Sequence, residues 1–216
     1  MADACRLVIL LSGSGSNLQA FIDSIARGEL HARIAAVVSN KATAGGLQRA
    51  TSAGIPTEIV DHKQFSNRAD FDTALRERVE IYRPDLVILA GFMRILTPQF
   101  LRPFHGKLLN IHPSLLPKYP GLYTHQRALD AGDKYAGATV HFVTEELDGG
   151  PAIVQASVLI EGDDTATAIA TRVLQIEHHI YPLAAQWYAQ GRLRLQGNRA
   201  MLDDKPLPAT GFIYQD

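Results

Sequence analysis

The sequence predicts an α/β protein with a three-layer, mostly parallel twisted sheet. The first observation is the unbroken apolar run Leu7–Leu11, which is typical of a strand covered by helices on both faces. The second is the alternation of strand and helix patterns through the first half of the chain, which indicates parallel strands joined by right-handed crossovers. Later strands are separated by turns alone, so we expect a mixed or antiparallel extension to a Rossmann-like amino-terminal half.

Apolar periodicity places the individual elements along the chain. Strands are expected over residues 7–11, 33–39, 57–60, 85–90, 107–110, 138–144, 152–160 and 193–195. Helices are expected over residues 18–28, 46–53, 71–82, a short stretch from Pro98, 123–131 and 165–189. The last helix is expected despite Pro182, because apolar residues recur there at helical spacing.

Length and composition bound the class of protein. The 216 residues fit one domain with a substantial core, and the net charge of -1 gives no sign of binding to nucleic acid or to an anionic membrane. Cys5 is the sole cysteine, so neither an internal disulfide nor a thiolate metal cluster is possible. The apolar run near the amino terminus is too short for a signal peptide or a membrane span, so we expect a cytoplasmic protein.

Asn110 and His112 carry the first chemical signal. They lie two residues apart at the end of a buried strand, which puts both side chains on one face. Pro113, Pro117 and Pro120 then make a stiff loop. Ligands of open α/β sheets bind at the carboxyl ends of strands, where an amide can stabilise an oxyanion and an imidazole can move a proton. The alternative, in which both residues satisfy loop backbone, stays open.

The turn Ser12–Asn17 (SGSGSN) joins the first strand to the first helix. Its glycines allow close approach to a ligand, and free N–H groups at a helix start suit an anion. It is not a dinucleotide fingerprint, because Leu18 replaces the third glycine and Ser39–Asn40–Lys41 contains no carboxylate for a ribose. A single phosphate group fits better; the alternative is a tight turn with a serine cap.

Two carboxylates are further candidate functional residues. Asp148 stands in a glycine-bearing loop that could also be a plain turn, and Glu177 stands at the edge of an apolar helix stripe, where a surface position is equally possible. His178 and His179 are adjacent and point to different faces, so they lack metal-ligand spacing. We predict no metal.

In combination these motifs are far more specific. SGSGSN at 12–17, AGFMRIL at 90–96, NIHPSLLPKYPG at 110–121, HFVTEELDGGP at 141–151 and EHHIYPL at 177–183 occur in order over essentially the whole chain. The chain therefore resembles the glycinamide ribonucleotide formyltransferases, which belong to the folate-dependent formyltransferases. The resemblance implies the formyltransferase fold, with a nucleotide-binding half at 1–105, a catalytic and folate-binding half at 106–195 and a tail at 196–216.

The resemblance also implies roles for individual residues. The catalytic trio matches Asn110, His112 and Asp148. The substrate-binding positions match Gly13, Ser14, Gly15, Ser16, Asn17 and Glu177. The folate-binding positions match Arg68, Met93, Arg94, Ile95, Leu96 and Asn110. The chain departs from the pattern at Ser14, where asparagine is common. It also departs at Tyr123, at the edge of the substrate site, where histidine is common.

The implied reaction transfers the formyl group of 10-formyltetrahydrofolate, a cosubstrate, to the amine of glycinamide ribonucleotide in purine biosynthesis. Asn110 would donate to the formyl oxygen, protonated His112 would donate or supply a proton, and Asp148 would favour the imidazolium. The expected partners are these small molecules, with no nucleic acid and no membrane, and the chain is expected to be a monomer or homodimer.

Three alternatives remain. A formyltetrahydrofolate hydrolase usually carries an additional amino-terminal domain, and a methionyl-tRNA formyltransferase usually carries an additional carboxyl-terminal one. A non-catalytic nucleotide-binding module would leave Asn110, His112 and Asp148 without a purpose.

Overall fold

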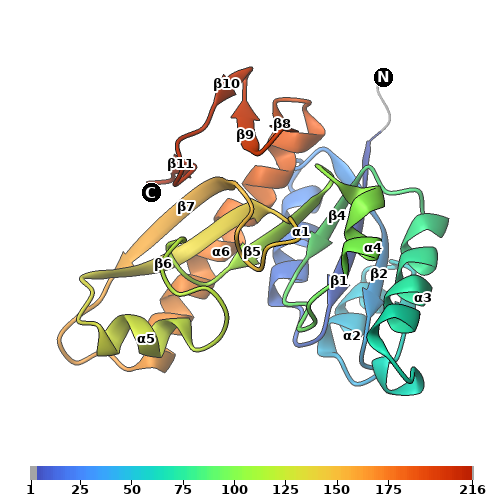
Figure 1. Ribbon diagram of the computed structural model, residues 1–216, viewed down its shortest axis with the longest axis horizontal. Helices are drawn as coiled ribbons and strands as arrows, with labels where there is room; N and C mark the ends of the chain where they lie inside the picture. The colour runs from blue at the N-terminus through green and yellow to red at the C-terminus, as the bar shows by residue number, and fades with distance from the viewer. Residues whose placement is uncertain (1–3, 216) are drawn as a thin grey trace. The chain divides into compact units, whose positions relative to one another are not determined.

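Four strands form the sheet of the first of two units in the computed structural model, which describes residues 4–215, and three of them are apolar and largely buried. This unit ends at Leu109, and its strands run in parallel in the order β3-β2-β1-β4 (Figure 1). The side chains of Leu7–Leu11 are fully buried, as expected for a strand with helices on both faces. The strands are β1 (Cys5–Leu11), β2 (Ala32–Ser39), β3 (Thr57–Ile59) and β4 (Leu86–Leu89).

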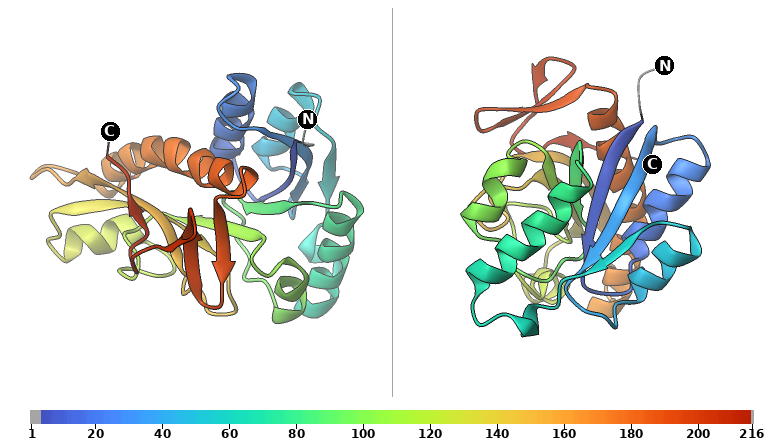
Figure 2. Two further views of the ribbon diagram at one scale, coloured as in Figure 1. Left: turned by 90° about the horizontal axis from the view of Figure 1, so that it is seen from above. Right: turned by 90° about the vertical axis from the view of Figure 1, so that its right-hand side faces the viewer.

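Helices cover both faces of these strands and give the predicted three layers. Helices α1 and α2 pack together on one face, and α3 and α4 pack together on the other (Figure 2). Pro84 follows α3 closely and, lacking an N–H, prevents the helix from continuing. The helices are α1 (Ser16–Ala26), α2 (Gly45–Ser52), α3 (Arg68–Ile81) and α4 (Pro98–Leu101), with 3₁₀ turns η1 (His62–Gln64) and η2 (Arg102–Phe104).

The second unit begins at Asn110 and contains the antiparallel extension. Its strands follow the order β5-β6-β7-β11, with β6 and β7 antiparallel and α6 packed on both. A separate antiparallel sheet contains β8, β9 and β10. The elements are β5 (Leu108–His112), which starts at the unit boundary, α5 (Thr124–Asp130), β6 (Tyr135–Phe142), β7 (Ala152–Leu159), α6 (Ala166–Ala189), β8 (Leu193–Gln196), β9 (Arg199–Leu202), β10 (Lys205–Pro206) and β11 (Phe212–Ile213).

The predicted fold class is confirmed, with local corrections to the predicted elements. Strand β5 continues to His112 rather than stopping near Asn110, and β6 begins at Tyr135 and ends at Phe142 rather than covering 138–144. Beyond residue 196, where we expected only a tail, β9 and β10 join β8 in an antiparallel sheet, and β11 pairs with β7. The functional division at residues 105 and 195 stays a prediction. Within residues 4–215 no helix combines the length and apolarity that a membrane crossing requires.

The turn between β1 and α1 depends on one close backbone approach. Gly15 caps α1 in the left-handed conformation, with φ 74°. A Cβ there would lie 2.5 Å from the Cα of Gly46 at the start of α2. Gly13 differs, because a Cβ there would meet no atom within 4 Å. Gly15 therefore shapes the turn, whereas Gly13 faces open space.

Candidate active site

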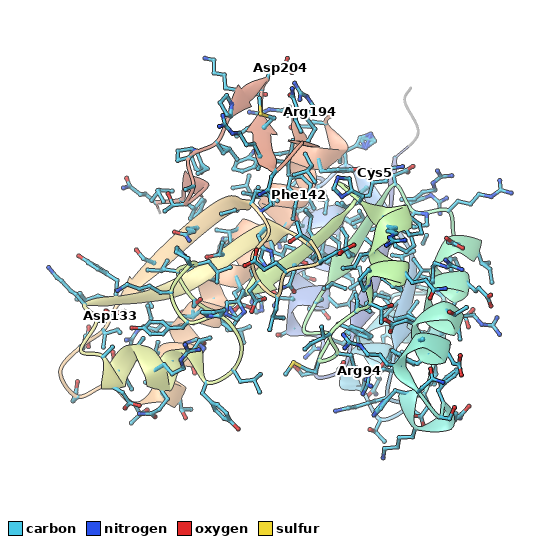
Figure 3. The ribbon with its side chains drawn as sticks, viewed as in Figure 1. Cys5, Arg94, Asp133, Phe142, Arg194 and Asp204 are labelled. Atoms are coloured by element: carbon cyan, nitrogen blue, oxygen red, sulfur yellow. The ribbon has the colours of Figure 1, made fainter. Side chains whose placement is uncertain are left out.

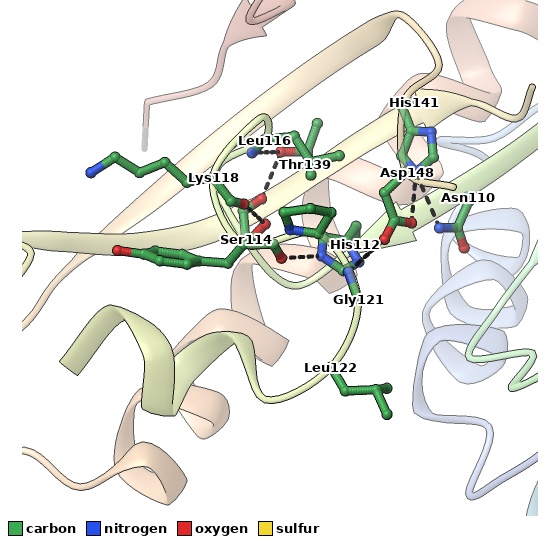
Figure 4. A network of polar contacts seen from close by, with 12 residues as sticks. Asn110, His112, Ser114, Leu116, Lys118, Gly121, Leu122, Thr139, His141 and Asp148 are labelled. Atoms are coloured by element: carbon green, nitrogen blue, oxygen red, sulfur yellow. Dashed lines mark hydrogen bonds and ion pairs between the residues drawn. The ribbon is translucent and has the colours of Figure 1, made fainter. Parts of the chain in front are cut away.

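A buried polar cluster in the second unit consists of Asn110, His112, His141 and Asp148 (Figure 4). Strand β5 contributes Asn110 and His112. The two residues are separated by one position on the strand, so their side chains share a face as predicted. The side chains of His112 and Asp148 are each 8% exposed, and that of His141 is 3% exposed. Electrostatic interactions in such a site are stronger than in water.

His141, on β6, holds the amide of Asn110. The Nδ1 of His141 lies 2.9 Å from the carbonyl oxygen of Phe142, which can only accept, so Nδ1 carries the proton. Its Nε2 is then an acceptor, and Asn110 donates one Nδ2–H to it at 3.1 Å. Burial lowers the pKa of His141 and keeps the ring neutral, as this bond requires. The second Nδ2–H of Asn110 has no partner among residues 4–215.

His112 has the opposite tautomer. Its Nε2 lies 2.9 Å from the carbonyl oxygen of Tyr119, so Nε2 donates its proton to that oxygen. Its Nδ1 faces the Oδ2 of Asp148 at 3.5 Å, which is longer than an ordinary hydrogen bond. Nδ1 is therefore the nitrogen that can gain or release a proton without breaking the contact with Tyr119.

Asp148 reaches this position because its loop bends sharply. The backbone of Asp148 is left-handed, with φ 52°, a conformation that aspartate tolerates better than most residues. A Cβ at Gly150 would lie 1.8 Å from the carbonyl oxygen of Phe142, so only glycine permits the return to β7. Gly121 donates its backbone N–H to Asp148 Oδ2 at 2.9 Å, and Asp148 Oδ1 lies 3.9 Å from His141 Nε2.

Buried side chains of β6 and β7 hold the proline loop, residues 113–121, which follows β5 and includes Tyr119 and Gly121. Thr139 donates to the carbonyl oxygen of Ser114 at 2.7 Å and accepts from the N–H of Leu116 at 3.0 Å. Gln155 donates to the carbonyl oxygen of Leu116 at 2.6 Å. Farther along, Asp133 accepts from the Tyr119 hydroxyl at 2.8 Å. These bonds hold the loop's backbone groups against His112 and Asp148.

The predicted substrate-binding residues are divided between the units. In the first unit, Gly13 and Ser14 are exposed, while Ser16 and Asn17 form the first turn of α1. The carbonyl oxygen of Ser14 accepts from the Nε of Arg49 at 2.9 Å. In the second unit, Glu177 is buried on α6, so the surface alternative is excluded for it.

The predicted folate-binding residues of the first unit lie on an irregular segment after β4 and on α3. Met93 and Ile95 are 64% and 58% exposed, whereas Leu96 is buried. Arg68 is exposed at the start of α3 and donates to the carbonyl oxygen of Ile95. Cys5 lies at the beginning of β1 (Figure 3), and burial raises the pKa of its thiol to about 11, so its nucleophilic thiolate is scarce near neutral pH.

Sequence reasoning missed His141 and the backbone groups of Tyr119 and Gly121. His141 stands in the motif HFVTEELDGGP, but its role depends on the adjacency of β5 and β6. A histidine two residues beyond Thr139, in the mostly apolar run of β6, is the signal that could have singled it out.

Comparisons with known proteins match nearly the whole chain. Residues 5–185 match the formyl transferase family. The chain is 51% identical over 211 residues to the phosphoribosylglycinamide formyltransferase of Escherichia coli (strain K12), covering 98% of this chain and 100% of the relative. It is 49% identical over 210 residues to that of Haemophilus influenzae, covering 97% and 99%. The solved phosphoribosylglycinamide formyltransferase of Coxiella burnetii has a TM-score of 0.95 and 48% identity, covering 98% and 100% of the two chains.

We predict that the two histidines of the cluster occupy opposite tautomers. Long-range ¹H–¹⁵N NMR correlation should show His141 protonated at Nδ1 and neutral His112 protonated at Nε2. At pH 6.5, where an ordinary histidine is half protonated, His141 should be mostly neutral because burial lowers its pKa. Its signals are assigned by their loss in His141→Gln.

Because burial lowers the pKa of His141 in the folded state, His141 binds a proton more readily in the unfolded chain. The stability linked to His141 is thus complete above about pH 6.5 and falls as the pH decreases below that value. Titration of folded His141 at or above pH 6.5, or a proton on its Nε2, would contradict this arrangement.

Proposed function

The chain belongs to the formyl transferase family, and from that premise we infer that it transfers the formyl group of 10-formyltetrahydrofolate to the amine of glycinamide ribonucleotide. The products are formylglycinamide ribonucleotide and tetrahydrofolate, in purine biosynthesis. The cosubstrate supplies the one-carbon group, so the reaction needs only residues that orient two molecules, stabilise charge and move protons. The buried cluster of Asn110, His112 and Asp148 is the observation that supports this function within the structure.

Asn110 acts as the donor to the developing oxyanion. When the amine attacks the formyl carbon, negative charge accumulates on the formyl oxygen. His141 holds one N–H of the Asn110 amide, and the remaining N–H is directed away from that ring and is available to the oxygen. An oxyanion donor fixed in this way needs no reorganisation during the reaction, and loss of one such donor typically costs about 10²–10³ in rate.

His112 and Asp148 manage the protons. Tyr119 keeps the Nε2 of His112 protonated, so exchange takes place at Nδ1, on the side of Asp148. With a second proton on Nδ1, His112 is an imidazolium that the carboxylate of Asp148 stabilises. It can donate that proton to the intermediate, which leaves the ring neutral. The amine loses a proton as its bond to the formyl carbon forms, and the departing folate nitrogen gains one as its bond breaks. Asp148 helps a water molecule carry the amine's proton away.

The remaining residues bind the two substrates. Residues 13–17 hold the phosphate of the ribonucleotide through backbone N–H groups, and Glu177 contacts the ribonucleotide. Because these contacts are mostly backbone, the presence of Ser14 in place of asparagine matters little. On the first unit, Met93–Leu96 contact the folate, and Arg68 binds its glutamate tail. Asn110 contacts the same cosubstrate at the formyl oxygen.

A competition assay tests the function. The chain is supplied with 10-formyltetrahydrofolate and with glycinamide ribonucleotide, water and methionyl-tRNA as the acceptors. We expect rapid formylation of the ribonucleotide, with little hydrolysis and no formylated tRNA. Asn110→Ala should reduce turnover about 10²- to 10³-fold with both substrates still bound. Hydrolysis that is equally fast without the ribonucleotide would identify a hydrolase instead.

Substitutions at Gly13 and Gly15 should have different effects, the first on ribonucleotide binding and the second on the stability of the fold. Gly13→Ala adds a Cβ in open space, so we expect unchanged stability but a ribonucleotide KM raised about tenfold or more by obstruction of the phosphate. Gly15→Ala must strain a left-handed residue against Gly46 and should cost about 1–3 kcal/mol of unfolding free energy.

Urea unfolding and calorimetric titration with each substrate measure the two effects. Equal losses of ribonucleotide and folate affinity in Gly13→Ala would count against the phosphate assignment.

A further inference from the structure

We propose that Asp72 of α3 is a positioning residue that sets the shape of the folate-lining segment, residues 93–96, through a single hydrogen bond to Thr97. This inference rests on the proposed function, because it takes the assignment of that segment to folate as its starting point. All the contacts that carry it lie within the first unit. The carboxylate of Asp72 contacts the backbone of Thr97, which follows the segment, and Asp72 acts on the cosubstrate only through that segment.

Asp72 is a buried carboxylate on an otherwise apolar face of α3. Its side chain is 1% exposed and lies on the helix face that also buries Phe71, Leu75 and Val79. Its Oδ2 accepts the backbone N–H of Thr97 at 2.6 Å, while its Oδ1 is buried with no hydrogen-bond partner among residues 4–215. A leucine would fill such a position without the cost of burying a carboxylate, so packing alone does not account for an aspartate.

Thr97 marks the end of the irregular segment and the start of α4. It is the N-cap of α4, has an extended backbone with φ -78° and ψ 158°, and forms no side-chain capping bond. The bond from Asp72 therefore fixes the point at which the segment turns into the helix. Pro98, the next residue, has no N–H of its own to offer.

Other tethers hold the same segment nearer β4. Ser12 accepts the N–H of Met93 at 2.9 Å and donates to the buried Asn40 at 2.6 Å. Arg68 donates to the carbonyl oxygen of Ile95. The Arg94 guanidinium, labelled in Figure 3, lies 5.2 Å from the centre of the Phe71 ring, at cation–π distance. Three groups on α3, at positions 68, 71 and 72, thus contact Ile95, Arg94 and Thr97.

These tethers matter because two of the segment's apolar residues do not anchor it. Met93 and Ile95 expose most of their surface, so hydrogen bonds to the backbone, together with the burial of Leu96, determine where this apolar surface lies. A ligand that binds a fixed segment does not have to order it, whereas loss of a tether adds that ordering cost to binding. Asp72 should therefore affect folate affinity more than the chemical step.

The test compares three variants on one helix. In Asp72→Ala the acceptor is lost, and we expect the KM for 10-formyltetrahydrofolate to rise about 5- to 30-fold, with the ribonucleotide KM and kcat changed less than twofold. In Asp72→Asn the remaining Oδ1 can still accept from Thr97, so affinity should return close to that of the parent. Asp70→Asn is the matched control, because Asp70 is exposed on the same helix and pairs with Asn67 instead.

A second variant keeps the proposal testable if Asp72→Ala folds poorly. Thr97→Pro removes the donor while its backbone angle suits proline. It should raise the folate KM as Asp72→Ala does, and the double variant should be no worse than the worse single one. Amide hydrogen exchange should accelerate at residues 93–97 in Asp72→Ala and not in Asp70→Asn.

The two hypotheses fail in different ways. If the parent does not formylate the ribonucleotide, the proposed function is wrong, and tetrahydrofolate titration of the variants then tests Asp72 directly. If the parent is active but Asp72→Ala raises both KM values equally, or accelerates exchange without weakening tetrahydrofolate binding, Asp72 is not a positioning residue for folate.

Discussion

The contact between the Asp148 carboxylate and His112 is the interaction on which the second unit's site depends. A carboxylate this buried is costly unless donors face it, and the backbone N–H of Gly121 supplies one at 2.9 Å. That requirement fixes the proline loop, and it explains why Thr139 and Gln155 use buried polar atoms to hold that loop. The same loop offers the carbonyl of Tyr119 to His112, so one rigid segment positions both members of the pair.

The two histidines near Asp148 differ because their other partners differ. The Phe142 carbonyl takes the Nδ1 proton of His141 and burial keeps that ring neutral, so it can only orient Asn110. The Tyr119 carbonyl takes the Nε2 proton of His112 and leaves Nδ1 facing a carboxylate. The first unit uses the same strategy with backbone groups. There Ser12 and Asp72 hold an irregular segment in which Met93 and Ile95 stay exposed.

The sequence predicts what depends on local spacing. The two-residue separation of Asn110 and His112 is enough to place them on one strand face, and unbroken apolar runs locate the parallel strands of the first unit. His141 could not be assigned, because its contact with Asn110 depends on which strands are neighbours. Tyr119 and Gly121 act through backbone atoms, which side-chain patterns do not reveal. Gly15 has no room for a Cβ whereas Gly13 does, and this difference depends on the position of Gly46 beside the turn, which the sequence pattern does not reveal.

The central claim is that Asp148 acts on the reaction through His112. Single-turnover rates of formyl transfer in Asp148→Asn, His112→Ala and the double variant test this claim most directly, with both substrates saturating. We expect each single change to slow the transfer about 10²- to 10⁴-fold, and the double variant to be little slower than the worse single one, because residues that act as a unit are not additive. Rate losses that multiply in the double variant would show that the two residues work independently and would contradict this mechanism.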